Sequence, residues 1–108
     1  MTRYLYEAAL TPQAFAGFIK NPQDRAQAFR TLYEAVGGKL EEYYFAVGQN
    51  TVYVVGQFPD ETAVEALGMA VMAGGAVTSV KATAILTAAE AVEAMKKAGS
   101  IAYKPPTS

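Results

Sequence analysis

The sequence predicts an α+β domain with one four-stranded antiparallel sheet and helices on one of its faces. Three observations indicate this fold class. Four short apolar segments with alternating polarity occur along the 108 residues, as strands require. Segments with apolar residues at helical spacing separate them, and glycine, proline or asparagine stands near the junctions. An apolar share of 52% suffices for one core without a metal or disulfide.

The first third of the chain contains one predicted strand and two helical segments. Residues 3–10 are short, aromatic and apolar, which is typical of a strand. Thr11 can cap a helix, and Pro12 suits the first helical position. Pro22 disfavours helical geometry in the residue before it, so we expect a second helix after this break. That helix should end at Gly37-Gly38, since glycine tolerates the left-handed C-terminal position.

A hairpin and a third helix are predicted next. Residues 39–47 and 51–58 have the pattern of two strands, and Gly48-Gln49-Asn50 is a connection of hairpin length. Glycine and asparagine are expected there because both tolerate positive φ. Asp60 is a good N-cap for the following apolar helix, which should stop at Gly74-Gly75.

The last part of the chain predicts a fourth strand and a terminal helix. Residues 76–86 form the strand, and Thr87 with Glu90 three residues later makes a capping-box pattern. We therefore assign residues 1–99 to one domain and residues 100–108 to a C-terminal tail. The order β-α-β-β-α-β, followed by a helix, is the ferredoxin-like arrangement.

Side chains alternate between the two faces of a strand, which divides each strand into two sets. One set is nearly all apolar, and we assign it to the face under the helices: Leu5, Ala9, Tyr43, Phe45, Val47, Val52, Val54, Phe58, Val80, Ala82 and Ala84. The other set mixes aromatic and polar side chains on the uncovered face: Tyr4, Tyr6, Glu42, Tyr44, Thr51, Tyr53, Val55, Gln57, Ser79, Lys81, Thr83 and Ile85. Exposed tyrosines favour cover by a second copy of the sheet, and hence a homodimer or higher homo-oligomer.

Two sheets that meet in this way would enclose a tyrosine-lined space, which is typical of a small-molecule site. The candidate ligand-binding residues are Tyr4, Tyr6, Tyr44, Tyr53, Gln57, Lys81 and Thr83. Desolvation in a closed barrel would lower the pKa of Lys81, making it a base or an anion ligand. The alternatives are an ion pair of Lys81 with Glu42 at the rim, and tyrosines that serve only as an interface.

Other charged positions are interpreted as structural. Glu41 and Glu42 are adjacent in a strand, so we expect them on opposite faces and not as a catalytic pair. Arg25, beside Asp24 at the start of a helix, is interpreted as a solvated charge. No catalytic residue is assigned from the sequence.

Missing residue types exclude several function classes. The chain has no histidine and no cysteine, which removes zinc sites, histidine acid–base chemistry and thiol chemistry. Its net charge is −1 and its nine basic residues are scattered, which argues against nucleic acid. The N-terminus lacks the pattern of a secretory signal, and the weakly polar stretch 63–80 is too broken to span a membrane. We expect no cofactor, no metal, no membrane partner and a cytoplasmic location.

Several motifs, in order and at matching spacing, resemble those of the GYD domain family of small bacterial and archaeal proteins. The matching features are Pro22-Arg25-Ala26, Gly37-Gly38-Lys39-Leu40, Tyr43-Tyr44-Phe45, Gly48, Pro59-Asp60-Glu61 and Gly74-Gly75. The resemblance implies a dimeric α/β barrel and gives no substrate. The triplet that names the family is Gly-Tyr-Asp, whereas this chain has Gly48-Gln49-Asn50. Retention of glycine alone fits a turn better than a reaction centre.

Three functions follow as hypotheses. The first is a homodimer that binds a small apolar or aromatic molecule between its two sheets. The second, by analogy of fold alone, is a cofactor-free monooxygenase or isomerase. The third is a structural or accessory subunit whose mixed sheet face serves assembly.

Overall fold

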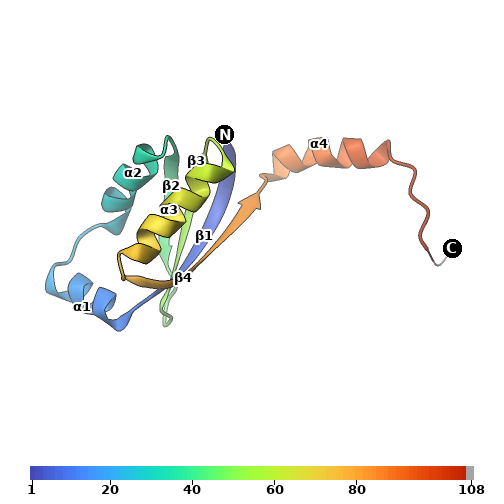
Figure 1. The fold of residues 1–108 in the computed structure, drawn as a ribbon. Coiled ribbons are helices and arrows are strands. Elements are labelled where there is room, and N and C mark those ends of the chain that lie inside the picture. Colours follow the sequence, from blue (N-terminus) through green and yellow to red (C-terminus); the bar gives the residue numbers. More distant parts are fainter. Residues whose placement is uncertain (107–108) are drawn as a thin grey trace.

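The computed structural model of the protein describes residues 1–106, which contain four strands and four helices. The elements in chain order are β1 (Thr2–Leu10), α1 (Pro12–Lys20), α2 (Arg25–Ala35), β2 (Lys39–Phe45), β3 (Thr51–Phe58), α3 (Glu61–Ala73), β4 (Val77–Ile85) and α4 (Ala88–Gly99). In Figure 1, α2 and α3 lie side by side over the sheet, and α1 lies at one end of it.

The strands form one antiparallel sheet in the order β2-β3-β1-β4, with β3 and β1 in the centre. This order confirms the ferredoxin-like prediction. The predicted helix starts are confirmed as well, because Thr11, Asp24 and Asp60 accept hydrogen bonds from backbone N–H groups in the first turn of α1, α2 and α3. Thr87 and Glu90 form the expected capping box of α4.

The face assignment of β1 is wrong by one residue. Tyr6 pairs with Val54 on one side and with Ala82 on the other, and residues that pair directly share a face. Tyr6 is buried under the helices, and Tyr4, which is partly buried, packs against the same core. Leu5 and Ala9 consequently lie on the uncovered face, in the positions expected for the tyrosines.

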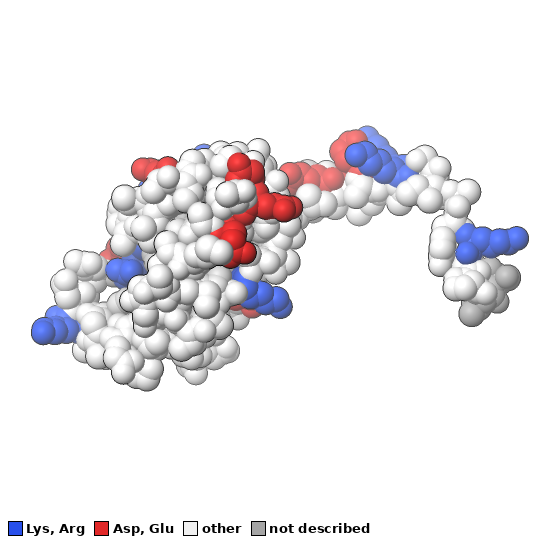
Figure 2. Space-filling model, in the orientation of Figure 1, with Lys and Arg blue, Asp and Glu red and all other residues white. Residues whose placement is uncertain are grey.

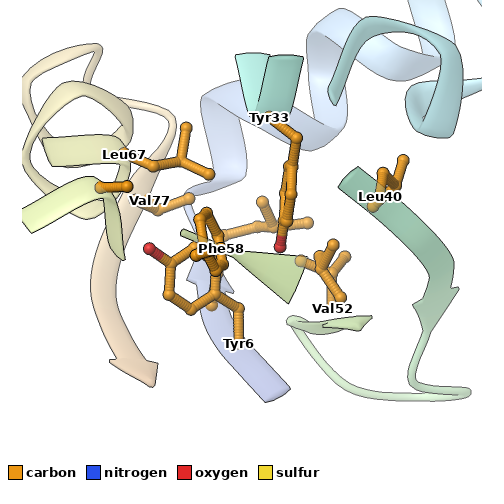
Figure 3. Packing of buried hydrophobic residues seen from close by; sticks show 11 residues of the cluster. Tyr6, Tyr33, Leu40, Val52, Phe58, Leu67 and Val77 are labelled. Carbon is orange, nitrogen blue, oxygen red and sulfur yellow. The ribbon is translucent and has the colours of Figure 1, made fainter. Parts of the chain in front are cut away.

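The core below α2 and α3 is built around stacked aromatic rings. Tyr33 of α2 and Phe58 of β3 are fully buried, and their ring centroids are 4.7 Å apart. The ring of Tyr6 lies 5.6 Å from that of Phe58 and 6.3 Å from that of Tyr33. Figure 3 shows these three side chains converging from a helix and two strands. They fix the height of α2 above the sheet.

The terminal helix α4 extends away from the rest of the chain (Figure 1). The radius of gyration is 17.5 Å, against about 13 Å for a compact domain of this length. This projecting arm, which comprises α4 and the residues that connect it to β4, exposes large apolar side chains, among them Leu86, Val92 and Met95. No helix within residues 1–106 combines the length and apolarity needed to cross a bilayer.

Candidate functional site

A cavity of about 170 Å³ lies between the helices and the sheet. We call it the helix-side cavity. Its walls are mainly apolar and come from α1, α2, α3 and all four strands; they include Tyr6, Phe18, Phe29, Leu32, Tyr43, Val52, Val54, Val71 and Val80. A concave, mainly apolar space with a few polar groups is the usual form of a small-molecule site.

Small residues on α3 and at its C-cap leave room for this cavity. Gly68, Ala70 and Gly74 are among its lining residues, and none of them carries a side chain beyond Cβ. A Cβ atom at Gly68 would have its nearest neighbours, the hydroxyl of Tyr6 and Cγ1 of Val80, at 4.0 Å. The helix therefore passes over the sheet without filling the space beside Tyr6.

Arg25 is the one charged residue among the described residues that line the cavity. Its guanidinium carbon lies 5.3 Å from the ring centroid of Phe18 and 5.9 Å from that of Phe29, within the range of cation–π contacts. Its Nε is buried and has no hydrogen-bond partner within residues 1–106. The interpretation of Arg25 as a solvated charge is therefore wrong.

Two tyrosines supply the other polar groups of the cavity wall. The hydroxyl of Tyr6 donates to the carbonyl oxygen of Val64, and burial raises the pKa of Tyr6 to about 12. Burial also raises the pKa of Tyr43, although the neighbouring Arg25 guanidinium opposes the rise. Both phenols consequently stay protonated at neutral pH and act as hydrogen-bond donors rather than bases.

A second groove, of about 370 Å³, runs between α3 and β4 on the same side of the sheet. It is more open to solvent than the helix-side cavity, and Glu61 and Glu65 of α3 contribute to its wall. Tyr4 lines this groove, and Tyr6 lines both spaces. Most of the face that Figure 2 shows carries neither acidic nor basic side chains.

The uncovered sheet face carries a hydrogen-bonded polar cluster. Arg3 Nε donates to Glu41 Oε1 over 2.6 Å, and Gln57 Nε2 donates to Glu41 Oε2 over 3.1 Å. The hydrogen bond from Arg3 holds the pKa of Glu41 below its usual value. The register between β2 and β3 shifts at Glu41, which is a β-bulge. The bulge puts Glu41 on the same face as Glu42, so the expectation of opposite faces is wrong.

The seven predicted ligand-binding residues are divided between the two faces. Tyr44 pairs directly with Tyr53 on the uncovered face, and the hydroxyl of Tyr44 donates to Glu42 over 3.0 Å. Thr83 also lies on that face, opposite Leu5. Gln57 lies on the same face, and its side-chain amide donates to Glu41. Tyr4 and Tyr6 lie on the other face, so the structure does not bring all seven together.

Lys81 lies on the uncovered face, and its side chain is 76% exposed in the single chain. Its Nζ is 3.9 Å from Glu7 Oε2 of β1. Within one chain Lys81 does not pair with Glu42, because Glu42 is on β2 at the opposite edge of the sheet. In the chain alone, Lys81 has the surroundings of a surface ion pair.

The connection between β2 and β3 is a structural turn. Gly48 has φ of +75°, which glycine adopts at little cost. The positive φ expected for Asn50 is not found, since no residue other than glycine in the described chain has one. The Asn50 carbonyl instead accepts from the N–H of Leu10 over 2.7 Å, and its side-chain amide donates to the Leu10 carbonyl over 3.4 Å. Asn50 thus ties the turn to the end of β1.

Sequence reasoning missed Arg25 as a residue of an internal site. A signal was present, because Arg25 and Phe29 are four residues apart on α2 and so share one side of that helix. Phe29 packs against the core, and its helix neighbour Arg25 consequently lies beside the core as well. Within residues 1–106 there is no group of three or more aspartate or glutamate side chains that could hold a metal ion.

Comparison with known proteins agrees with this fold. The family model "GYD domain" matches residues 4–97. A crystal structure of a protein from Agrobacterium tumefaciens is similar with a TM-score of 0.50 and 14% identity, over 82% of this chain and 94% of that one. At that identity the likeness shows the fold alone. None of the curated proteins compared matches this sequence. With nearly its whole sheet and all its connecting helices inside the matched range, the chain belongs to the GYD domain family.

Proposed function

We propose that the protein binds a small apolar or aromatic molecule in the helix-side cavity. The observation that carries this proposal is the mainly apolar space of about 170 Å³, with four aromatic side chains in its wall. An apolar cavity of about 150 Å³ stays dry and accepts benzene. Drug-sized ligands occupy larger sites, of about 300–1,000 Å³. The size therefore favours a ligand with a single ring.

The corrected register of β1 favours this cavity over the space between two sheets. Tyr4 and Tyr6 face the helices, which leaves Tyr44 and Tyr53 as the tyrosines of the uncovered face. Gln57 is already hydrogen-bonded to Glu41. The uncovered face thus has fewer tyrosines than the site predicted between two sheets. Its polar side chains also already bond to one another.

We expect toluene to bind the wild-type chain and to bind Val71→Phe at least about tenfold more weakly. Val71 lines the helix-side cavity, and a phenyl ring there would fill part of the space. Met72→Phe is the matched control, because the adjacent Met72 lines the second groove, between α3 and β4, and not the helix-side cavity. Chemical-shift titrations of labelled protein measure both, with circular dichroism as the check of folding. Equal affinities of toluene for the wild type and Val71→Phe would contradict the proposal, and so would the absence of binding by toluene and by other single-ring compounds.

We further propose that a second copy covers the uncovered sheet face. Leu5 and Val55 pair directly at its centre, and Tyr44 at its edge is 53% exposed. Leu86 and Val92 of the projecting arm add exposed apolar area on the same chain. Large exposed apolar patches are uncommon on monomeric proteins, and a two-fold axis is the commonest way to pair identical surfaces.

Val55→Glu is expected to convert the wild-type dimer into a folded monomer. The new carboxylate would lie at the centre of the covered face, opposite Glu42 on the neighbouring strand, and would be desolvated there without a partner. Ala66→Glu on the exposed side of α3 adds the same charge away from that face and should remain dimeric. Size-exclusion chromatography with light scattering distinguishes the two. A wild-type monomer at micromolar concentration would refute this interface.

The two other functions suggested by the sequence have less support. A cofactor-free monooxygenase or isomerase requires a base. Lys81 is largely exposed in the single chain, and the hydroxyl of Tyr6 already donates its hydrogen bond to the carbonyl oxygen of Val64. A purely structural subunit does not account for an internal cavity. It becomes the better explanation if the protein is dimeric and no single-ring compound binds.

A further inference from the structure

We infer that the ligand of the helix-side cavity carries an anionic group, such as a carboxylate on a single aromatic ring, and that Arg25 and Tyr43 bind this group. This inference rests on the proposed function and specifies its ligand class. Arg25 is thus a specificity-determining residue, and the apolar walls receive the ring.

The first argument is one unsatisfied donor of the Arg25 guanidinium, its Nε–H. Its planar group is held against the rings of Phe18 and Phe29, and its Nε–H is buried without an acceptor in the described chain. Buried polar groups are nearly always hydrogen-bonded, so an orphaned donor on a residue that lines the cavity indicates a missing acceptor near that wall. A guanidinium offers several donors in a planar fork that matches a carboxylate.

The second argument is that no protein carboxylate neutralises Arg25. Among the residues described, the ion pairs are those of Arg3, Lys81 and Lys96, and Arg25 forms none within 4.0 Å. Asp24 adjoins it in sequence, but Asp24 Oδ1 accepts from the N–H of Ala26 as the cap of α2. The positive charge that lines the cavity is therefore available to a ligand.

The third argument is the phenol beside it. Tyr43 lines the same cavity, and its ring lies 5.3 Å from that of Phe29. Burial raises the pKa of Tyr43 against the influence of Arg25, so at neutral pH the phenol retains the proton it would donate. Arg25 and Tyr43 together form a corner of donors in an apolar space, which suits one anionic group attached to one ring.

The competing explanation is that Arg25 only closes the cavity by stacking on Phe18 and Phe29. Such a role requires no charge on the ligand. A pair of probes with similar shape and different charge separates the two explanations. Toluene and benzoate are such a pair.

We expect the wild-type chain to bind benzoate at least about tenfold more tightly than toluene in chemical-shift titrations. Arg25→Met keeps an apolar stem against the two rings and should abolish this preference while leaving toluene affinity within about twofold. Tyr43→Phe should weaken benzoate about threefold or more. Arg30→Met is the matched control, because Arg30 is exposed on the same helix and bonds Gln27. It should keep the full preference.

The outcomes separate this inference from the function on which it rests. If neither probe binds, the proposed function fails. If toluene binds and benzoate binds no better, or if Arg25→Met keeps the preference, the anionic ligand is refuted and the binding function stands. Should Arg25→Met not fold, Arg25→Lys keeps the charge without the planar fork. It should lose at least about threefold in benzoate affinity, and an unchanged affinity would refute the inference.

Discussion

Replacing Phe58 with alanine is expected to lower the free energy of unfolding by about 3–5 kcal/mol. The side chain is 0% exposed and lies at the centre of the aromatic core. Its ring centroid is 4.7 Å from that of Tyr33, 5.6 Å from that of Tyr6 and 5.9 Å from that of Tyr4. Alanine would remove one partner from all three contacts and leave a void between helix and sheet, which costs both transfer and cavity free energy.

Urea denaturation followed by circular dichroism measures this loss. The matched variant is Phe45→Ala, since Phe45 also contacts two aromatic rings but is 47% exposed at the edge of β2. Its loss should be clearly smaller, because much of its apolar surface is in water before the change. A loss below about 1 kcal/mol for Phe58→Ala would show that the aromatic core is not packed as described.

The order of elements could be predicted from the sequence because each one is encoded locally. The caps at Thr11, Asp60 and Thr87 and the glycines after the helices lie where their signals predict them. The sheet order then follows from the ferredoxin-like connection of the elements. Chain-local signals of this kind do not depend on what packs against them.

The faces of β1 could not be assigned from its alternation alone. Both of its sets contain large apolar or aromatic side chains, and tyrosine is common on either face of a sheet. The stronger signal was charge: Arg3 and Glu7 belong to the same set as Leu5, and charged residues are rarely buried without partners. Weighting those two residues above the tyrosines would have given the observed register.

The bulge at Glu41 and the contact of Phe18 with Arg25 were beyond prediction for a different reason. A bulge is set by how two strands pair, and no glycine or proline in β2 announces it. The position of Arg25 depends on α1 folding back so that Phe18 contacts its guanidinium. Both are long-range consequences of packing. Together with the corrected register of β1, they favour a site under the helices over one between two sheets.

Gly56→Ala is expected to lower the free energy of unfolding by about 1–3 kcal/mol or more. Gly56 lies in the middle of β3, opposite Tyr4 and Leu40 on the helix face. An added Cβ would lie 2.4 Å from Cε2 of Tyr33 and 2.7 Å from the carbonyl oxygen of Lys39. The first contact involves a fully buried ring and the second involves backbone, so neither can move aside cheaply.

The close approach of Tyr33 to Gly56 explains why this strand position cannot carry a side chain. Gly17→Ala adds the same methyl group where nothing lies within 4 Å in the middle of α1, and should raise stability by about 0.5–1 kcal/mol. Thermal and urea denaturation compare the two variants. In the double variant with Tyr33→Ala, the loss should be smaller than the sum of the single losses, because the clash with the ring is then absent. If the losses of stability in the two single variants add up to that of the double variant, the strain of Gly56→Ala lies at the Lys39 carbonyl instead. A Gly56→Ala protein as stable as the wild type would contradict the packing of α2 on β3.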